Sequence, residues 1–261
     1  MPYRRFTFDP NIQTLPVQTV GTKSTKKLTL ALLSGGISSE REVSLNSGRQ
    51  VYEALDKDRY DILRYDPKND LPRLVADAAR IDAALIILHG AFGEDGTVQG
   101  LLDLLGIPYQ GSGVLGSAVA MNKLAAKRLY QHAGLPIPDF IVARRGSRPD
   151  SGEAERRLGM PLVVKPVVGG SSVGITIVRS PQELDSALEA AFAHDASVLI
   201  EACIDGTEIT GGVIGNDALE ALPLIEIIPD RSRPFFDYEA KYTDGVTQEI
   251  CPARIDAELN A

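Results

Sequence analysis

The chain has 261 residues, of which 44% are hydrophobic and 24% charged, and its formal net charge at pH 7 is −8. This composition is ordinary for a globular protein with a substantial core, and the acidic balance argues against a nucleic-acid-binding surface. No apolar stretch is long enough to span a bilayer, and two cysteines with three histidines are too few for a disulfide framework or a His/Cys zinc site. We therefore expect a cytoplasmic protein that binds neither nucleic acid nor membrane. The first 26 residues include three prolines and no signal-peptide core, which predicts a mobile or loosely docked extension.

The first regular elements predict a strand, a turn and a helix. Residues 27–33 have the apolar pattern of a buried strand, and a glycine- and serine-rich turn follows them. A helix is expected to begin near Glu40, because Ser39 and Glu42 have capping-box spacing, and its Val43 can face a core. This arrangement favours a negative ligand, or places a side chain at the carboxyl edge of a sheet.

The following segments predict that this sheet is parallel. Strands are expected at 61–65, at the fully apolar 83–88 and, for a short stretch, at 107–110. Helices are expected at 71–80 and 97–105.

Three polar residues follow the apolar strand: His89, Glu94 and Asp95. Ligands of open parallel sheets bind beyond the carboxyl ends of the strands, so these side chains are candidates for substrate contact, and a structural histidine is the alternative for His89. Segment 111–116 matches Gly-x-Gly-x-x-Gly, but it follows three earlier strands and no acid ends a strand 20 residues later. We therefore reject a dinucleotide site. Lys123, on the next helix, is either a solvated surface lysine or a ligand for an anion.

The second half of the chain predicts an α+β arrangement after a break rich in glycine and proline at 134–138. The strands expected there are 139–143, 198–201, 209–214 and 222–228. Helices are expected at 151–158 and from Ser180 onward. The second of these helices carries an apolar stripe made of Leu184, Ala187, Leu188, Ala191 and Phe192.

Two β-like runs, 161–164 and 174–178, flank a glycine- and serine-rich loop. They predict a hairpin whose tip, with Ser171 and Ser172, offers N–H groups and hydroxyls to phosphate oxygens. Lys165 at the start of the loop can neutralise a phosphate, although the order of a Walker A loop is absent. An ordinary flexible hairpin is the alternative interpretation.

Five groups of motifs occur in one order along the chain, and together they identify a family. They are Ser-Glu-Arg-Glu-Val-Ser-Leu at 39–45, His-Gly at 89–90 with Gly-Glu-Asp-Gly at 93–96, Gly-Ser-Gly at 111–113, Lys-Pro at 165–166 with Gly-Ser-Ser-Val-Gly at 170–174, and Tyr-Glu-Ala-Lys-Tyr at 238–242. On these motifs, residues 27–261 resemble the D-alanine–D-alanine ligases of the ATP-grasp superfamily.

The resemblance implies an α/β fold and an activity. The implied units are an N-terminal parallel-sheet domain at 27–120, which binds substrate, a central ATP-grasp subdomain at 121–210 and the start of a C-terminal ATP-grasp subdomain at 211–261. The implied activity is ATP-dependent joining of two D-alanines through an acyl phosphate, for peptidoglycan synthesis. The implied cofactors are ATP and Mg²⁺ (or Mn²⁺), and relatives are commonly homodimers.

The resemblance also implies roles for particular residues. Glu40 matches the glutamate that holds the first substrate, and Ser171 and Tyr242 complete a hydrogen-bonded triad with it that closes the site. The residues implied to contact substrate are Val43, His89 and Glu94. The residues implied to bind ATP are Lys123, Lys165, Ser171, Ser172, Glu201, Ala202, Ile204, Glu208 and Lys241. By their residue types alone, Glu201 and Glu208 are better interpreted as solvated carboxylates.

The resemblance comes with two departures from the family pattern, one residue that specifies the second substrate, and two alternative functions. Ala202 stands where some relatives have lysine, and Tyr242 implies D-alanine rather than D-lactate as the second substrate. Relatives continue into a region that supplies an arginine and the Asp, Glu and Asn that hold metal, so metal ligands are expected beyond Ala261 and the chain is expected to be a truncated form. Another ATP-grasp carboxylate–amine ligase and a non-catalytic nucleotide-binding fragment remain as alternatives.

Overall fold

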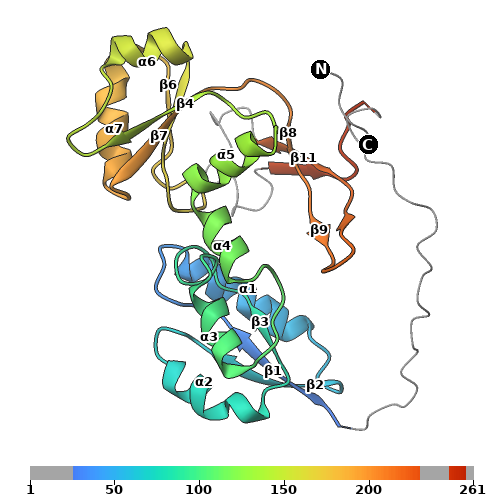
Figure 1. Cartoon of the computed structure of the whole chain (residues 1–261). Helices are drawn as coiled ribbons and strands as arrows, with labels where there is room; N and C mark the ends of the chain where they lie inside the picture. The colour runs from blue at the N-terminus through green and yellow to red at the C-terminus, as the bar shows by residue number, and fades with distance from the viewer. Residues whose placement is uncertain (1–25, 230–246, 257–261) are drawn as a thin grey trace.

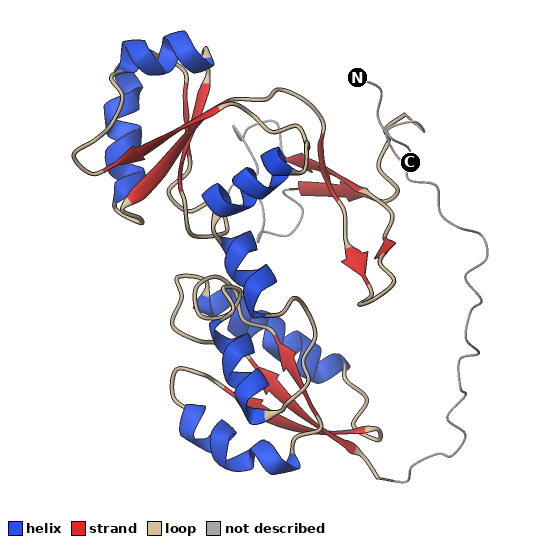
Figure 2. Cartoon of the chain, in the orientation of Figure 1, coloured by secondary structure: helices blue, strands red, loops and turns tan. Residues whose placement is uncertain are grey.

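The computed structural model describes residues 26–229 and 247–256 (Figure 1). Their strands form an N-terminal parallel sheet, a central antiparallel sheet, a third antiparallel sheet and a short two-stranded ribbon (Figure 2). Among these residues, no helix is both long and apolar enough to cross a bilayer. The predicted N-terminal extension, apart from Lys26, and the motif at 238–242 lie outside the described ranges.

The N-terminal sheet has the order β2-β1-β3, and all its strands are parallel. Its strands are β1 (Leu28–Leu33), β2 (Tyr60–Tyr65) and β3 (Ala83–Ile86). Its helices are α1 (Arg41–Ala54), α2 (Leu71–Asp77), which continues as a 3₁₀ turn at Ala78–Arg80, and α3 (Thr97–Leu105). Because β1 lies between the other two strands, its second half is fully buried, which explains its continuous apolar sequence.

Two local predictions in this part are wrong. The helix after the glycine turn has Glu40 rather than Ser39 at its N-cap, and no side chain caps it. The expected strand at 107–110 is reduced to one bridge between Ala84 and Tyr109. The residue before the predicted cap, Ser38, donates its hydroxyl proton to the carbonyl of His89.

Two consecutive helices connect the N-terminal sheet to the central sheet (Figure 1). They are α4 (Val114–Met121) and α5 (Lys123–His132). The break falls at Asn122, whose Oδ1 accepts a hydrogen bond from the N–H of Ala125 at 3.0 Å and so caps α5. The glycine motif at 111–116, which resembles a dinucleotide fingerprint, provides the N-cap of α4, Gly113, and the first three residues of that helix.

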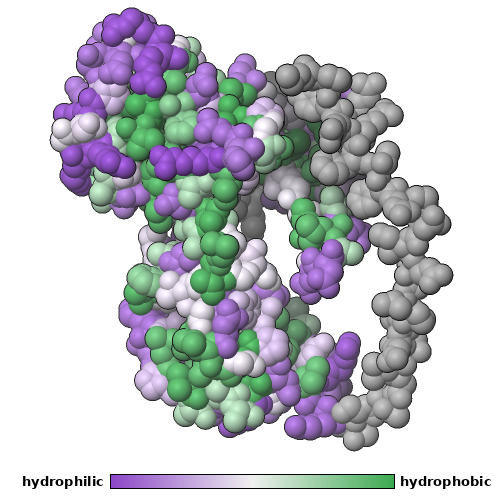
Figure 3. Space-filling model, in the orientation of Figure 1, coloured by the Kyte–Doolittle hydropathy of each residue, from purple (hydrophilic) through white to green (hydrophobic). Residues whose placement is uncertain are grey.

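The central sheet has the order β4-β7-β5-β6 and is antiparallel throughout. It contains β4 (Phe140–Arg144), β5 (Leu162–Pro166), β6 (Thr176–Val178) and β7 (Ser197–Ala202). Helix α6 (Ser151–Leu158), a 3₁₀ turn (Pro181–Glu183) and α7 (Leu184–Phe192) complete this part. The hydrophilic outer surface over α6 is visible in Figure 3. The predicted β5–β6 hairpin and the α7 stripe are confirmed, and all five stripe residues are buried.

The third sheet has the order β12-β11-β8. Its strands are β8 (Glu208–Thr210), β11 (Ile225–Pro229) and β12 (Thr247–Ile250), and the ribbon between β8 and β11 consists of β9 (Val213–Ile214) and β10 (Glu220–Ala221). The apolar run at 209–214 is therefore two strands rather than one. The division falls at Gly211 and Gly212, and a Cβ on Gly211 would lie 2.6 Å from the Leu224 side chain, so this position needs a residue without a side chain.

Candidate active site

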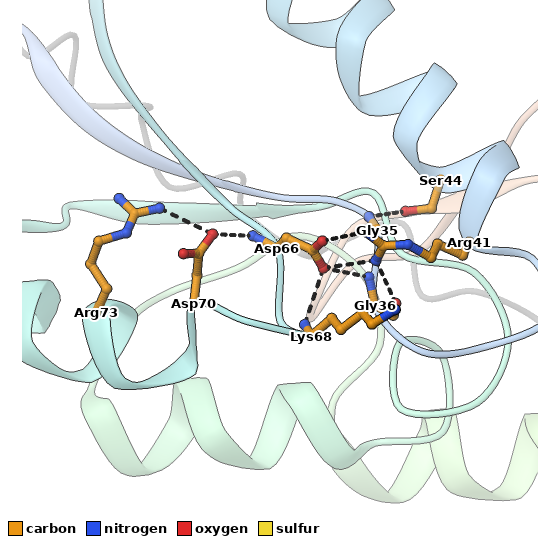
Figure 4. Close-up of polar contacts among 8 residues, drawn as sticks. All are labelled: Gly35, Gly36, Arg41, Ser44, Asp66, Lys68, Asp70 and Arg73. Atoms are coloured by element: carbon orange, nitrogen blue, oxygen red, sulfur yellow. Dashed lines mark hydrogen bonds and ion pairs between the residues drawn. The ribbon is translucent and has the colours of Figure 1, made fainter.

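The turn before α1 is held by an ion pair that the sequence analysis did not single out. Arg41 Nη2 lies 2.6 Å from Asp66 Oδ2, and Arg41 also donates to the carbonyl oxygen of Gly36. Asp66 accepts the N–H of Gly36 at 2.9 Å and that of Lys68 at 3.0 Å (Figure 4). The end of β2 thereby fixes the turn that leads to Glu40.

These contacts determine the ionisation of Asp66. The hydrogen bond from Arg41, followed by backbone N–H donors, lowers the pKa of Asp66 to about 2 despite partial burial. Its neighbour Asp70 accepts the N–H of Asp66 and pairs with Arg73, and these contacts lower the pKa of Asp70 as well (Figure 4). Both carboxylates are therefore ionised at neutral pH, and they anchor the turn electrostatically.

Glu40 itself is buried, with 4% of its surface exposed. Its carboxylate accepts a hydrogen bond from the hydroxyl of Ser171, which lies 131 residues later in the loop of the β5–β6 hairpin. Glycines allow this approach: a Cβ on Gly90 would lie 2.4 Å from Glu40 Oε2, and one on Gly170 would lie 3.3 Å from the same oxygen. The N-terminal sheet and the hairpin loop therefore meet at one carboxylate, which can bind a cationic group.

The segment after β3 lies beside this carboxylate. Glu94 accepts the N–H of Gly90 at 2.6 Å, which holds the turn of residues 90–94. His89 is half-buried, and its Nε2 is shielded from solvent with no hydrogen-bond partner among the described residues. An unsatisfied buried ring nitrogen is uncommon and is a place where a substrate can donate or accept a hydrogen bond. Val43 lies on α1, one turn after Glu40, and is half-buried.

Lys123 anchors the hairpin loop to the start of α5. Its Nζ donates to the carbonyl of Gly169 at 2.7 Å, and its backbone N–H donates to Val167 at 3.0 Å. A polar cleft of about 470 Å³ opens here, between the carboxyl edge of the N-terminal sheet and the hairpin loop. Its lining includes Glu94, Gln99, Gln110, Ser112, Lys123 and Gly169.

Lys165 and Glu201 share one face of the central sheet. In the observed register Lys165 is opposite Leu199 and Glu201 is opposite Val163, so both side chains project away from the core that α6 and α7 cover. Lys165 Nζ lies 2.6 Å from Glu201 Oε2, and the glutamate side chain is only 5% exposed. The carboxylate therefore orients the lysine.

Lys127 is a second cation at the same carboxylate, and the sequence analysis missed it. Its Nζ lies 3.0 Å from Glu201 Oε1 and 5.0 Å from the centre of the Phe140 ring, and the residue is buried. The available signal was its spacing of four residues from Lys123, which places both lysines on one face of α5.

The remaining sites expected from the sequence are separate from this cluster or outside the described residues. Ala202 ends β7, Ile204 is 70% exposed in the connection that follows, and Glu208 begins β8 with its side chain exposed. Ser172 is half-buried in the hairpin loop. Lys241 and Tyr242 lie outside the described ranges. Within those ranges, no group of three or more His, Cys, Asp or Glu residues could hold a metal ion.

Comparisons with known proteins show the family to which the chain is similar. Families described as "D-ala D-ala ligase N-terminus" and "D-ala D-ala ligase C-terminus" match residues 66–112 and 129–261. The D-alanine–D-alanine ligase of Syntrophobacter fumaroxidans is 62% identical over 238 residues, which cover 91% of this chain and 76% of that protein.

Solved structures give the same result. The crystal structure of the D-alanine–D-alanine ligase from Bacillus anthracis matches with a TM-score of 0.74 and 42% identity, over 89% of this chain and 74% of that one. The structure of the Bacillus anthracis ligase complexed with ATP matches with a TM-score of 0.72 and 38% identity, over 89% and 72% of the two chains. These similarities confirm the resemblance and the α/β ATP-grasp fold. The chain belongs to the D-alanine–D-alanine ligase family.

Proposed function

We propose that this protein joins two D-alanines into D-alanyl-D-alanine at the expense of ATP, as a step of peptidoglycan synthesis. The observation that carries this proposal is the contact between Glu40 and Ser171, which brings a buried carboxylate to the loop of a hairpin whose root holds Lys165. A carboxylate can bind the ammonium of an amino acid, and a lysine beside a glycine-rich loop can bind phosphate.

The reaction proceeds in two steps. A carboxylate oxygen of the first D-alanine attacks the γ-phosphorus of ATP, and ADP leaves with the electrons of the broken P–O bond. The amine of the second D-alanine, after losing a proton, attacks the acyl carbon, and the tetrahedral intermediate expels inorganic phosphate. The products are the dipeptide, ADP and phosphate. Positive charge near the phosphates stabilises the first step, because negative charge spreads over the transferred oxygens.

The side chains of the N-terminal part and of the hairpin take the substrate roles. Glu40 holds the ammonium of the first D-alanine. Ser171 fixes the carboxylate of Glu40 and, together with Tyr242, closes the site. The buried nitrogen of His89 supports a substrate contact there. Val43 and Glu94 shape the same subsite, Val43 from α1 and Glu94 through its bond to Gly90.

The proposed nucleotide site combines the hairpin with the connection from β7 to β8. Lys123, Lys165 and Lys241 neutralise the phosphates. The loop residues Ser171 and Ser172 cover them. The base and ribose are lined by Glu201, Ala202, Ile204 and Glu208, where Ala202 contributes its backbone. The roles assigned to Lys241 and Tyr242 rest on the family resemblance.

We propose Mg²⁺ (or Mn²⁺) as the metal that accompanies ATP, because phosphate oxygens are the hard ligands that these ions prefer. The described residues do not form a metal site of their own, so no step is assigned to a metal held by them. Loss of activity in EDTA, with recovery on adding excess Mg²⁺, tests this requirement.

We further propose the division into units at 27–120, 121–210 and 211–261, preceded by an extension at 1–26. Strand β8 connects the last two units, because it lies at the end of the second and pairs with β11 of the third. A cytoplasmic location and a homodimer also remain proposals, and sedimentation of the purified protein tests the dimer.

The assay for the proposed function measures inorganic phosphate released from ATP by the purified protein. We expect release with D-alanine, formation of D-alanyl-D-alanine in equal amount, and no release with L-alanine. The variant Glu40→Gln should raise the KM for the first D-alanine and leave ATP binding intact, because the amide lacks the negative charge. Phosphate release that does not depend on D-alanine, or an unrelated product, would contradict the proposal.

A further inference from the structure

Three charged side chains meet on the face of the central sheet that points away from α6 and α7. Glu201 lies between Lys165, at 2.6 Å from Oε2, and Lys127, at 3.0 Å from Oε1. The side chains of Glu201 and Lys127 are 5% and 9% exposed, whereas that of Lys165 is 22% exposed. The glutamate and Lys127 are thus enclosed, and Lys165 is the member of the group that a ligand can reach.

The charges of these three side chains do not balance. Two ammonium groups face one carboxylate, so the group carries one net positive charge in a largely enclosed position. Uncompensated buried charge is unfavourable, and an anion that binds at the accessible lysine would neutralise it. Without Lys127, Glu201 and Lys165 would form a neutral pair, and Lys165 would attract an anion much less strongly.

The surroundings of Lys127 suit a permanent structural cation rather than a ligand contact. Its ammonium lies over the Phe140 ring at 5.0 Å and within 3.3 Å of the carbonyl oxygen of Pro138, as well as beside Glu201. These contacts come from the segment before β4, from β4 and from β7, so α5 is fixed to the sheet by this side chain.

We propose that Lys127 is a positioning residue for nucleotide phosphate: it occupies one oxygen of Glu201 and supplies the positive charge that leaves Lys165 free to bind an anion. This inference rests on the proposed function, because it takes the anion to be the phosphate chain of ATP. Glu201 Oε1 is paired with Lys127 but has no hydrogen-bond partner among the described residues, so it keeps the capacity to accept a hydrogen bond from a bound base.

Calorimetric titration of the full chain with ADP and, separately, with adenosine tests the inference. Adenosine has the base and ribose but no phosphate, so the ratio of the two affinities reports the phosphate contribution. We expect Lys127→Gln, which keeps a hydrogen-bond donor but removes the charge, to weaken ADP binding about tenfold, or about 1.4 kcal/mol, and to leave adenosine binding unchanged. Lys127→Arg should retain most of the ADP affinity.

The matched control is Arg128→Gln, which removes a positive charge from the exposed neighbouring position of α5 and should bind ADP as the unaltered protein does. Lys127→Met provides a second neutral variant whose stem can still cover Phe140. Unchanged ADP affinity in the neutral variants, an equal loss of ADP and adenosine binding, or failure of both to fold would overturn the assignment. If the unaltered protein shows no preference for ADP over adenosine, the proposed nucleotide site itself fails.

Discussion

Glu40 has its carboxylate enclosed by backbone as much as by side chains. The backbone of Gly90 has φ +69°, a conformation that favours glycine, and a Cβ there would meet Glu40 Oε2 at 2.4 Å. A Cβ on Gly170 would lie 3.3 Å from the same oxygen, and the φ of Gly170 is outside the left-handed region. The two glycines therefore differ in how much displacement of the carboxylate a methyl group would cause.

Replacing each glycine by alanine should displace the Glu40 carboxylate to a different extent. We expect Gly90→Ala to lower kcat/KM for D-alanine about 100-fold, because a displacement of about 1 Å at a positioned group can have this effect, and Gly170→Ala to cause a much smaller loss. Steady-state kinetics at saturating ATP provide the measurement. Equal losses in the two variants would contradict the geometry at Glu40.

The ion pair of Asp66 with Arg41 should appear in the acid stability of the protein. The folded pKa of Asp66, about 2, is below its unfolded value of about 3.9, so its stabilising contribution is complete above about pH 5 and is lost as the pH falls toward 2. We expect Asp66→Asn to be less stable than the unaltered protein at pH 7. Between about pH 5 and pH 2 its unfolding free energy should fall by less than that of the unaltered protein.

Denaturant unfolding over a pH series measures this difference. Asp61→Asn is the control, because Asp61 is exposed on β2, the strand that Asp66 directly follows, and makes no such ion pair among the described residues. If the unfolding free energy of Asp66→Asn changed with pH as that of the unaltered protein does, the ion pair would not contribute to the acid stability.

At the scale of elements, α7 is the part whose packing follows most directly from its sequence. Its stripe recurs every three or four residues, and Leu188 in it is fully buried against the central sheet. Glu189, the next residue, faces solvent and pairs with Arg148 at 2.7 Å. One helix therefore offers a buried and an exposed position side by side.

Substitutions at these two positions should differ strongly in their effect on stability. Leu188→Ala removes buried methyl groups and leaves a cavity, so we expect the free energy of unfolding to fall by about 2–5 kcal/mol. Glu189→Ala removes an exposed ion pair and should change it by less than about 1 kcal/mol. Urea titrations of both variants test the comparison, and similar midpoints would contradict the observed orientation of α7.

At the scale of the molecule, the proposed site uses parts of the chain that belong to different sheets. Glu40 and His89 come from the N-terminal sheet, Lys123 from α5, and Lys165 and Ser171 from the central hairpin. A nucleotide that contacts α5 and the hairpin together would stabilise the folded arrangement of both.

ATP should therefore raise the thermal stability of the whole protein. At a concentration 100 times its Kd, a ligand that binds only the folded state stabilises it by about 2.7 kcal/mol. We expect a corresponding shift in the melting temperature with ATP, and a much smaller one in Lys165→Ala at the same ATP concentration. Scanning calorimetry measures both, and an undiminished shift in the variant would contradict the phosphate role of Lys165.

The sequence by itself determined most of the local structure and the family. Apolar periodicity located α7 and the parallel strands, and the glycine-rich loop located the β5–β6 hairpin, because these features depend on neighbours within a few residues. The order of motifs identified the family, since several short patterns in one order are far more specific than any one of them. The capping box predicted at Ser39 and Glu42 was wrong, because the helix has Glu40 at its N-cap and no side chain caps it.

The family resemblance implied the contact between Ser171 and Glu40, whereas only the tertiary structure decided which other side chains meet. The register of β5 against β7 places Lys165 and Glu201 on one face, and the packing of α5 adds Lys127 to them. The approach of Ser171 to Glu40 depends on two glycines far apart in the chain, Gly90 and Gly170. No spacing in the sequence encodes these contacts, because each arises from the way strands and helices distant in sequence pack together.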